Sequence, residues 1–210
     1  MLYRAIRKLT PVGIDYQSVV FFLLDLKQRT FPLSEASRPV ACHIIDSTQD
    51  QWFRILSLAY PAQQFHLRMQ HDCQQCHIAI VDGNLVGYAW VTTSPCHISE
   101  INFTLPVGLG RLYIYDCFVE SAYRGQGIYQ SLLMTIIADY RKRRWPNQYR
   151  TACIGAEPDN TASIRGIKRA GFEEFTRARY VHVGQFSRWY GVNSLIAHMS
   201  ENRPDQVVSD

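Results

Sequence analysis

A six-residue run near the middle of the chain has the residue types of an anion-binding turn: Arg124, Gly125, Gln126, Gly127, Ile128 and Tyr129. A stretch that favours a strand, residues 111–119, leads into the run, and a periodic helical segment follows it. Glycine lets the backbone approach a ligand closely because it has no Cβ. The first amides of a helix have no intrahelical partner and can therefore bind an anion. The pattern predicts a phosphate or pyrophosphate site, and we expect the chemistry to take place beside it.

Three kinds of glycine-rich phosphate loop compete for this run. A P-loop requires a lysine after its last glycine, and none follows here. The dinucleotide loop of oxidoreductases requires a third glycine, where Gln130 stands, and an acid at a shorter spacing than Glu157 offers. The third pattern is Gln/Arg-x-x-Gly-x-Gly/Ala, which Arg124 and Gly127 match in type and Tyr129 matches in position only. A plain strand-to-helix turn also stays open.

A second motif lies downstream of this loop. Residues 151–157 predict a short buried strand, after which Asn160 and Ser163 precede a Gly-Phe turn at 171–172. In their order and spacing, the two motifs resemble those of the GNAT superfamily of acyl-CoA N-acyltransferases. The resemblance covers residues 40–190. It implies that acetyl-CoA is the co-substrate.

The resemblance also implies where acetyl-CoA binds. Its pyrophosphate would lie on the amides of residues 126–129, and its pantetheine would pair with the strand end near Phe118 and Val119. Asn160 and Ser163 would contact it from the following helix. The expected cofactor-binding residues are Phe118, Val119, Arg124, Gly125, Gln126, Gly127, Ile128, Tyr129, Asn160 and Ser163.

Acetyl transfer to an amine needs a neutral nucleophile, so a base or a water chain has to take a proton. The candidates are Glu100, Asp116 and Tyr115, although a phenol with an ordinary pKa of about 10 is a poor base. Strand alternation places Asp116 on the opposite face from Tyr115. The amide of Val119 is a candidate donor to the thioester oxygen. The family's acid tyrosine would fall where Ile167 stands, so the acid for the leaving thiolate is elsewhere or absent.

The function that the resemblance implies is that of an acetyl-CoA-dependent N-acetyltransferase. It would move an acetyl group to the amine of a small molecule, such as an amino sugar, by direct transfer in a ternary complex. Two alternatives stay open. One is an acyl-CoA-binding protein without turnover, because the acid and the base are unassigned. The other is a nucleotide-linked oxidoreductase, which Gln130 disfavours.

The composition narrows the class of protein. The chain has 210 residues, 47% apolar and 19% charged, so it can bury a sizeable core. Its net charge of +4 suits an anionic ligand but is too small to indicate nucleic acid. No apolar run can span a bilayer, residues 19–24 are too short for a signal peptide, and six scattered cysteines fit reduced thiols. We expect a cytoplasmic protein without nucleic-acid or membrane partners, with a homodimer left open.

Residues 73–77 read Cys-Gln-Gln-Cys-His, a pattern of c-type haem attachment sites and of half a zinc site. Covalent haem calls for export, which the N-terminus does not support. A structural zinc ion usually needs four ligands, which the Cys-His pairs at 42–43 and 96–97 would have to complete. The simpler interpretation is a packed turn before a strand, and we predict no metal site.

Periodicity and turn residues predict the elements that must position these side chains. Apolar residues recur every four positions from Ile128 to Tyr140, which predicts a helix packed on a sheet. The turn at 82–84, Asp-Gly-Asn, predicts a hairpin, and residues 97–105 are expected to form a further hairpin arm. The other predicted strands are 40–45, 77–81, 85–92, 111–119, 151–157, 173–182 and 185–190. The sum is an α+β fold that resembles GNAT proteins, a mixed, mostly antiparallel sheet flanked by helices.

The chain divides into three parts in this interpretation. Residues 1–39 are an N-terminal extension with a strand or buried segment at 16–26 and a proline-containing linker at 30–39. Residues 40–200 are the GNAT-like acyltransferase domain. Residues 201–210 are polar and are expected to form a flexible tail.

Overall fold

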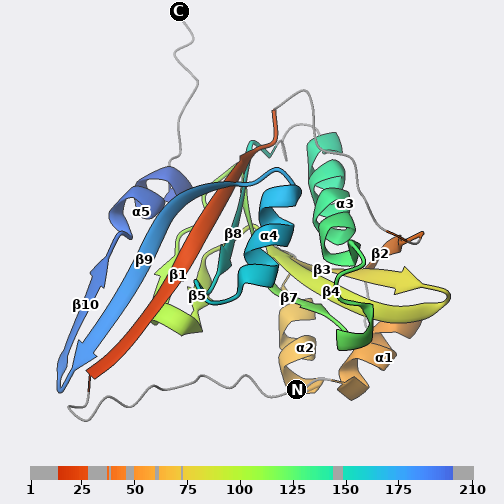
Figure 1. Cartoon of the computed structure of the whole chain (residues 1–210), viewed down its shortest axis with the longest axis horizontal. Helices are drawn as coiled ribbons and strands as arrows, with labels where there is room; N and C mark the ends of the chain where they lie inside the picture. The colour runs from red at the N-terminus through yellow and green to blue at the C-terminus, as the bar shows by residue number, and fades with distance from the viewer. Residues whose placement is uncertain are drawn as a thin grey trace, which may run out of the picture.

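The computed structural model describes residues 14–27, 37, 39–45, 50–59, 62–71, 73–143 and 149–200, without the side chains of 57–59 and 62–64 (Figure 1). Its main feature is an eight-stranded sheet in the order β10-β9-β1-β8-β7-β4-β3-β2. The strands are β1 (Ile14–Asp25), β2 (Ala41–Ile45), β3 (Gln74–Val81), β4 (Asn84–Thr92), β5 (Cys96–Ile98), β6 (Phe103–Leu105), β7 (Arg111–Val119), β8 (Thr151–Ala156), β9 (Glu173–Val183) and β10 (Phe186–Tyr190). The helices are α1 (Gln51–Ala59), α2 (Ala62–Met69), α3 (Ile128–Lys142), α4 (Thr161–Arg169) and α5 (Asn193–Ser200), with short 3-10 turns η1 (Ser99–Ile101) and η2 (Ser121–Tyr123).

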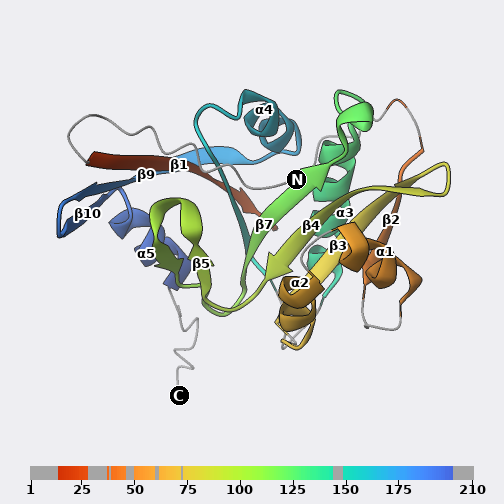
Figure 2. The ribbon, with the colours of Figure 1, turned by 90° about the horizontal axis from the view of Figure 1, so that it is seen from below.

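The α+β fold predicted from the sequence is confirmed. Strands β7 and β8 are parallel, and the other neighbouring pairs of the described sheet are antiparallel. Helices α3 and α4 share one core cluster with β1, β7 and β8, whereas α1 and α2 pack in another against β3 and β4. Trp90 and Val91 are adjacent in β4 but belong to different clusters, so the two helix groups cover opposite faces (Figure 2). None of the described helices is long and apolar enough to cross a membrane.

Strand β1 lies inside the sheet, between β9 and β8 (Figure 1). The side chains of Phe21 and Phe22 are fully buried, and they point into two different core clusters. The strand or buried segment expected at 16–26 is thus a strand, and it contributes to the same sheet as the two predicted motifs. The first 13 residues and the expected tail at 201–210 lie outside the described residues.

The hairpin predicted at Asp82-Gly83-Asn84 is confirmed between β3 and β4. Asp82 and Gly83 both have positive φ, of 50° and 77°, as a tight hairpin turn of this kind requires. The single arm expected at 97–105 is wrong. The segment instead forms a separate two-stranded sheet, β5 and β6. The chain reverses in η1 and at Asn102, whose left-handed φ of 44° ends the turn and starts the return strand.

Candidate active site

A bulge interrupts β7 at one of the predicted bases. The register between β4 and β7 shifts between Tyr88 and Trp90, so Asp116 and Cys117 together face one residue of β4. Asp116 has a left-handed φ of 46°, a conformation that aspartate adopts more readily than most residues. The expectation that Asp116 lies on the opposite face from Tyr115 is wrong, because the extra residue cancels the alternation and one arginine of α2 contacts both side chains.

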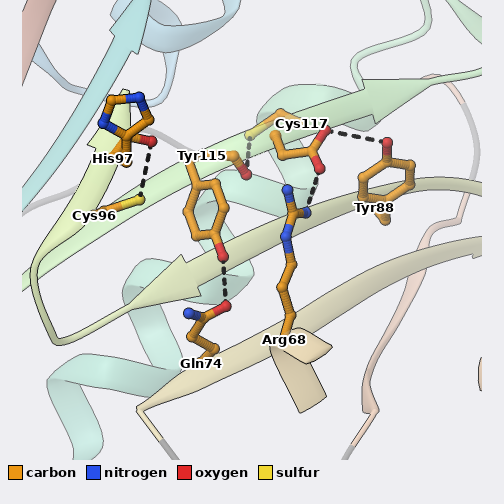
Figure 3. Close-up of polar contacts among 8 residues, drawn as sticks. Arg68, Gln74, Tyr88, Cys96, His97, Tyr115 and Cys117 are labelled. Atoms are coloured by element: carbon orange, nitrogen blue, oxygen red, sulfur yellow. Dashed lines mark hydrogen bonds and ion pairs between the residues drawn. The ribbon is translucent and has the colours of Figure 1, made fainter. Parts of the chain in front are cut away.

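That arginine is Arg68, whose guanidinium points toward β7 between Tyr115 and Tyr88 in Figure 3. Its Nη1 pairs with the carboxylate of Asp116, and the hydroxyl of Tyr88 donates to Asp116 Oδ1 at 3.3 Å. The guanidinium carbon is 5.2 Å from the ring centroid of Trp90 and 5.1 Å from that of Tyr115. Although burial alone would lower the pKa of Arg68, its hydrogen bond and charge attraction to Asp116 raise that pKa above its ordinary value. The bulge therefore carries a carboxylate fixed beside a permanent cation.

Tyr115 is held as a protonated phenol. Burial raises the pKa of Tyr115 well above its ordinary value, more than the nearby positive charge of Arg68 lowers it. The hydroxyl of Tyr115 donates to Oε1 of Gln74 at 2.8 Å (Figure 3). A protonated phenol cannot take a proton from an amine. The geometry therefore makes Tyr115 a wall and a hydrogen-bonding group of the site rather than a base.

Glu100, the other carboxylate candidate, lies in η1 and not on an arm of the large sheet. The hydroxyl of Ser99 donates to Glu100 Oε2 at 3.2 Å, and the residue is partly exposed. Burial raises the pKa of the neighbouring Cys96 thiol to about 11, and the charge of Glu100 adds to this rise. Among the described residues, Glu100 is hydrogen-bonded to Ser99 whereas Asp116 is paired with Arg68, so the two predicted carboxylates do not share a partner.

Strands β7 and β8 separate immediately before the bulge. Their parallel ladder joins Arg111–Ile114 to Thr151–Ile154, whereas β7 continues to Val119 and β8 to Ala156. Residues 115–119 of β7 thus have β4 on one side, and their other edge faces the gap toward β8. Such an edge can pair with the amides of an extended ligand. Phe118, predicted to contact the coenzyme, lies on this stretch with its ring 5.7 Å from that of Tyr88.

The glycine-rich loop that follows has the conformation of an anion-binding turn. Gly125 and Gly127 have left-handed φ values of 79° and 77°, and Gly127 directly precedes α3. The first helical hydrogen bond runs from the amide of Ser131 to the carbonyl of Gly127, at 3.0 Å. The amides of the preceding turn therefore point out of the helix end, where the helix dipole adds positive potential. Arg124 donates from Nε to the carbonyl of Val119 at 2.9 Å, which orders the loop against the end of β7.

Helix α4 borders the same gap. Asn160 caps it by accepting the amide of Ser163 at 3.1 Å, and the hydroxyl of Ser163 donates to the phenolic oxygen of Tyr129 at 3.3 Å. The ring of Tyr129 lies against Gly166, since a methyl group at Gly166 would be 2.5 Å from Tyr129 Cδ1. The structure therefore gathers the predicted coenzyme residues of β7, the loop, α3 and α4 around one gap in the sheet.

Sequence reasoning missed Arg68, Tyr88 and Gly166. Arg68 lies 48 positions before its partner Asp116, in a helix without a recognisable motif. Tyr88 was placed correctly in a strand, but its contact with Asp116 depends on the bulge. The signal for Gly166 was present, because a glycine inside a helical pattern often has a packing reason.

The cysteine–histidine pattern does not converge on one point. Cys76 is fully buried in the cluster with Trp90 on the α2 side of the sheet. His77 points to the other face, with its ring centroid 6.2 Å from that of Tyr140 in α3. Cys73 Sγ contacts the hydroxyl of Ser94 at 3.0 Å. Within the described part of the chain, no three histidine, cysteine or acidic side chains are grouped as metal ligands are.

Comparisons with known proteins identify the family of the chain and similar folds. The model of the acetyltransferase (GNAT) family matches residues 42–172, from β2 to the Gly-Phe turn after α4. A functionally unknown conserved protein from Staphylococcus epidermidis superposes with a TM-score of 0.53 at 14% identity, over 81% of this chain and 63% of that one. The aminoglycoside N-acetyltransferase AAC(6')-Iy in complex with CoA gives a TM-score of 0.45 at 19% identity, over 64% of this chain and 92% of that one. No curated protein matches the sequence.

Proposed function

The chain belongs to the acetyltransferase (GNAT) family, and we propose that it acetylates the amine of a small molecule by direct transfer in a ternary complex. It is an acyltransferase, and acetyl-CoA is its co-substrate. The observation that carries the proposal is the gap that opens where β7 leaves β8, because this gap lies between the anion-binding loop and the bulge. A pantetheine chain in the gap would extend from the loop to the bulge.

In this proposal the coenzyme is held by the residues around the gap. Its pyrophosphate lies on the amides of Gln126, Gly127, Ile128 and Tyr129, with Gly125 allowing close approach and Arg124 ordering the loop. Its pantetheine pairs with the edge of β7 that faces away from β4, at Phe118 and Val119. Asn160 and Ser163 approach it from the first turn of α4.

The acceptor amine meets Asp116 at the bulge. A carboxylate there can hold the amine and take its proton, and Arg68 and Tyr88 fix the direction of that carboxylate. Tyr115 supplies an aromatic wall that suits the apolar face of an amino sugar. Glu100 is the alternative base, acting from the β5–β6 insertion.

Direct transfer is favoured over an acetylated enzyme by the state of Cys117, the thiol next to the bulge. Burial raises the pKa of Cys117 to about 12, so the thiol stays protonated at neutral pH. A protonated thiol is a poor nucleophile. All six cysteines are free, which fits the reducing cytoplasm where we place the protein.

The test is thiol release from acetyl-CoA in the presence of a panel of amines that includes amino sugars, simple alkylamines and amino acids. We expect release with at least one class and initial-rate lines that intersect when both substrates are varied. Parallel lines would indicate an acetylated enzyme instead. Tight binding of CoA with no thiol release would favour a coenzyme-binding protein, and retention on NAD in place of CoA would favour an oxidoreductase.

A matched pair of variants assigns the base. Asp116→Asn and Glu100→Gln both remove a charge and keep the shape of the side chain. If Asp116 takes the proton, its variant lowers kcat about 100-fold or more at neutral pH, while the Glu100 variant stays within a fewfold of the parent. The opposite ranking would move the base to the β5–β6 insertion.

A further inference from the structure

The phenol of Tyr129 occupies a place that the loop motif normally leaves empty. The motif has glycine or alanine at this position. The larger tyrosine fits here because a glycine of α4, Gly166, lies opposite its ring. Any side chain at Gly166 would collide with the ring, since even its first carbon would be 2.5 Å from Tyr129 Cδ1. The ring is therefore held flat between the first turn of α3 and the middle of α4.

The hydrogen bonds of this phenol give its proton a direction. The hydroxyl of Ser163 donates to the phenolic oxygen at 3.3 Å, which uses that oxygen as an acceptor. The phenol in turn is hydrogen-bonded to the thiol of Cys117, the residue after the bulge. Because the thiol of Cys117 donates to the carbonyl of Tyr115 at 3.7 Å, its sulfur, at the edge of β7, is the acceptor toward the phenol of Tyr129. Because β7 has left β8 at this point, the same edge is the one that the proposed pantetheine would follow.

The helix that borders the gap offers no competing acid at the position expected from the family. Ile167 is fully buried, and it packs in the core cluster with α3 and β8. Among the described residues of α4, the hydroxyl nearest the phenol is that of Ser163, which is itself engaged as a donor to Tyr129. The phenol of Tyr129, in contrast, is hydrogen-bonded to the sulfur of Cys117.

We propose that Tyr129 donates its phenolic proton to the departing sulfur of CoA, an inference that rests on the acetyl transfer proposed above. The amine nitrogen attacks the thioester carbon, and the carbon–sulfur bond breaks with its electron pair on sulfur. The proton of the phenol passes to that sulfur and gives the CoA thiol. The amine releases one proton during the reaction, and this proton returns to the phenolate through water.

The environment of the phenol suits this role. Burial raises the pKa of Tyr129 well above its ordinary value, so the phenol keeps its proton until a thiolate forms beside it. The same burial destabilises a bare thiolate, and the proton therefore moves as the charge develops. The substitution of Ile167 for the family's tyrosine is then compensated by a tyrosine from the neighbouring helix.

The first test needs no acceptor and uses CoA labelled with 13C at the carbon next to its sulfur. NMR titration of the bound coenzyme measures the ionisation of its thiol in the parent protein and in Tyr129→Phe. A phenol that donates to the sulfur stabilises the thiolate, so we expect the ionisation constant to fall about tenfold in the variant. Equal ionisation constants in the two proteins would overturn the proposal.

The second test is kinetic, with Tyr16→Phe as the matched control because it removes a phenolic hydroxyl from a side chain that is 59% exposed on β1. We expect Tyr129→Phe to lower kcat about 100-fold with the KM for acetyl-CoA within threefold, and the control to match the parent. An increase in KM with kcat unchanged would make Tyr129 a binding residue only. If Tyr129→Phe does not fold, Ser163→Ala releases the phenol from its donor, and an unchanged kcat there would also contradict the proposal.

The two proposals fail separately. A shifted thiol ionisation without acetylation of any amine would contradict the proposed function and leave the role of the phenol toward sulfur standing. Acetylation of an amine by the parent protein, with full activity in Tyr129→Phe, would support the proposed function and contradict the role of the phenol.

Discussion

At the scale of single residues, the ion pair between Arg68 and Asp116 connects α2 to the bulge. Both side chains are mostly buried, with exposed fractions of 26% and 19%. A partly buried carboxylate that loses its cation keeps its desolvation cost without the compensating attraction. The pair therefore has a larger role in stability than an ion pair on the surface of the protein.

We predict that Arg68→Met lowers the free energy of unfolding by about 1–3 kcal/mol, because it leaves Asp116 unpaired. Lys168→Met is the control, since Lys168 and Glu174 are paired on the surface with exposed fractions of 52% and 46%. Its effect should stay within about 0.5 kcal/mol. Urea unfolding monitored by circular dichroism measures both. Equal effects would mean that the carboxylate is well solvated without its arginine.

His77 makes the stability depend on pH. Burial lowers its pKa from 6.5 to about 4, with a smaller opposing effect of Asp139, and its Nε2 is buried without a hydrogen-bond partner among the described residues. Between these two pH values the unfolded chain binds a proton that the folded chain does not. The contribution of this residue to stability is therefore complete above pH 6.5 and falls as the pH is lowered toward 4, by about 3 kcal/mol in total.

The prediction is that His77→Leu flattens the loss of unfolding free energy between pH 6.5 and 4, whatever its effect at neutral pH. Thermal and urea unfolding across this range measure the slope. His97→Leu, at an exposed histidine, is the control and should keep the slope of the parent. If the unfolding free energy of His77→Leu falls as steeply between pH 6.5 and 4 as that of the parent protein, another group causes the loss of stability in acid.

At the scale of elements, the contact between α3 and α4 depends on Gly166. We predict that Gly166→Ala destabilises the protein by about 1 kcal/mol, although alanine is the better helix former, because the ring of Tyr129 has to move. The same displacement should lower kcat. Arg165→Ala, at the exposed neighbour in α4, should change neither quantity. A more stable and fully active Gly166→Ala protein would mean that the ring moves without consequence.

Elements that depend on local residue patterns could be predicted from the sequence. The hairpin at Asp82 and Gly83 and the order of strand, glycine loop and helix around Gly127 all follow from short-range signals. The bulge at Asp116 carried no such signal, since one extra residue in a strand does not alter its composition. The contact of Arg68 with Asp116 depends on that bulge and on a helix far away in the sequence. The periodicity of the residues therefore could not predict this contact.

At the scale of the whole molecule, the sheet separates the two halves of the proposed site. Asp116 contacts α2 on one face, whereas Cys117 packs with the cluster of α3 and α4 on the other. The bulge thus turns two consecutive residues toward opposite sides at the point where β7 and β8 part. In the proposed reaction the acceptor approaches from the α2 side, and the thiol leaves on the α3 side.

Because of the position of β1, the gap between β7 and β8 depends on the N-terminal segment. The family match begins at residue 42, yet β8 pairs with β1 along residues 20–25, on the edge that faces away from β7. Without β1, strand β8 would lose this partner, and β9 would be detached from the sheet. The residue pattern predicted a strand or buried segment here but not its partners, because pairing between distant segments leaves no local signal.

We therefore predict that Phe22→Ala lowers the free energy of unfolding by about 3–5 kcal/mol, since this side chain is fully buried in the core beside α3 and α4. Tyr16→Ala changes the same strand at a side chain that is 59% exposed, and its effect should stay within about 0.5 kcal/mol. A chain that starts at residue 28 should fail to unfold cooperatively, because it lacks β1 altogether. Urea unfolding measures the two variants and the shortened chain. A cooperative, CoA-binding shortened chain would show that the remaining strands close the sheet without β1 and that the N-terminal segment is dispensable for the gap.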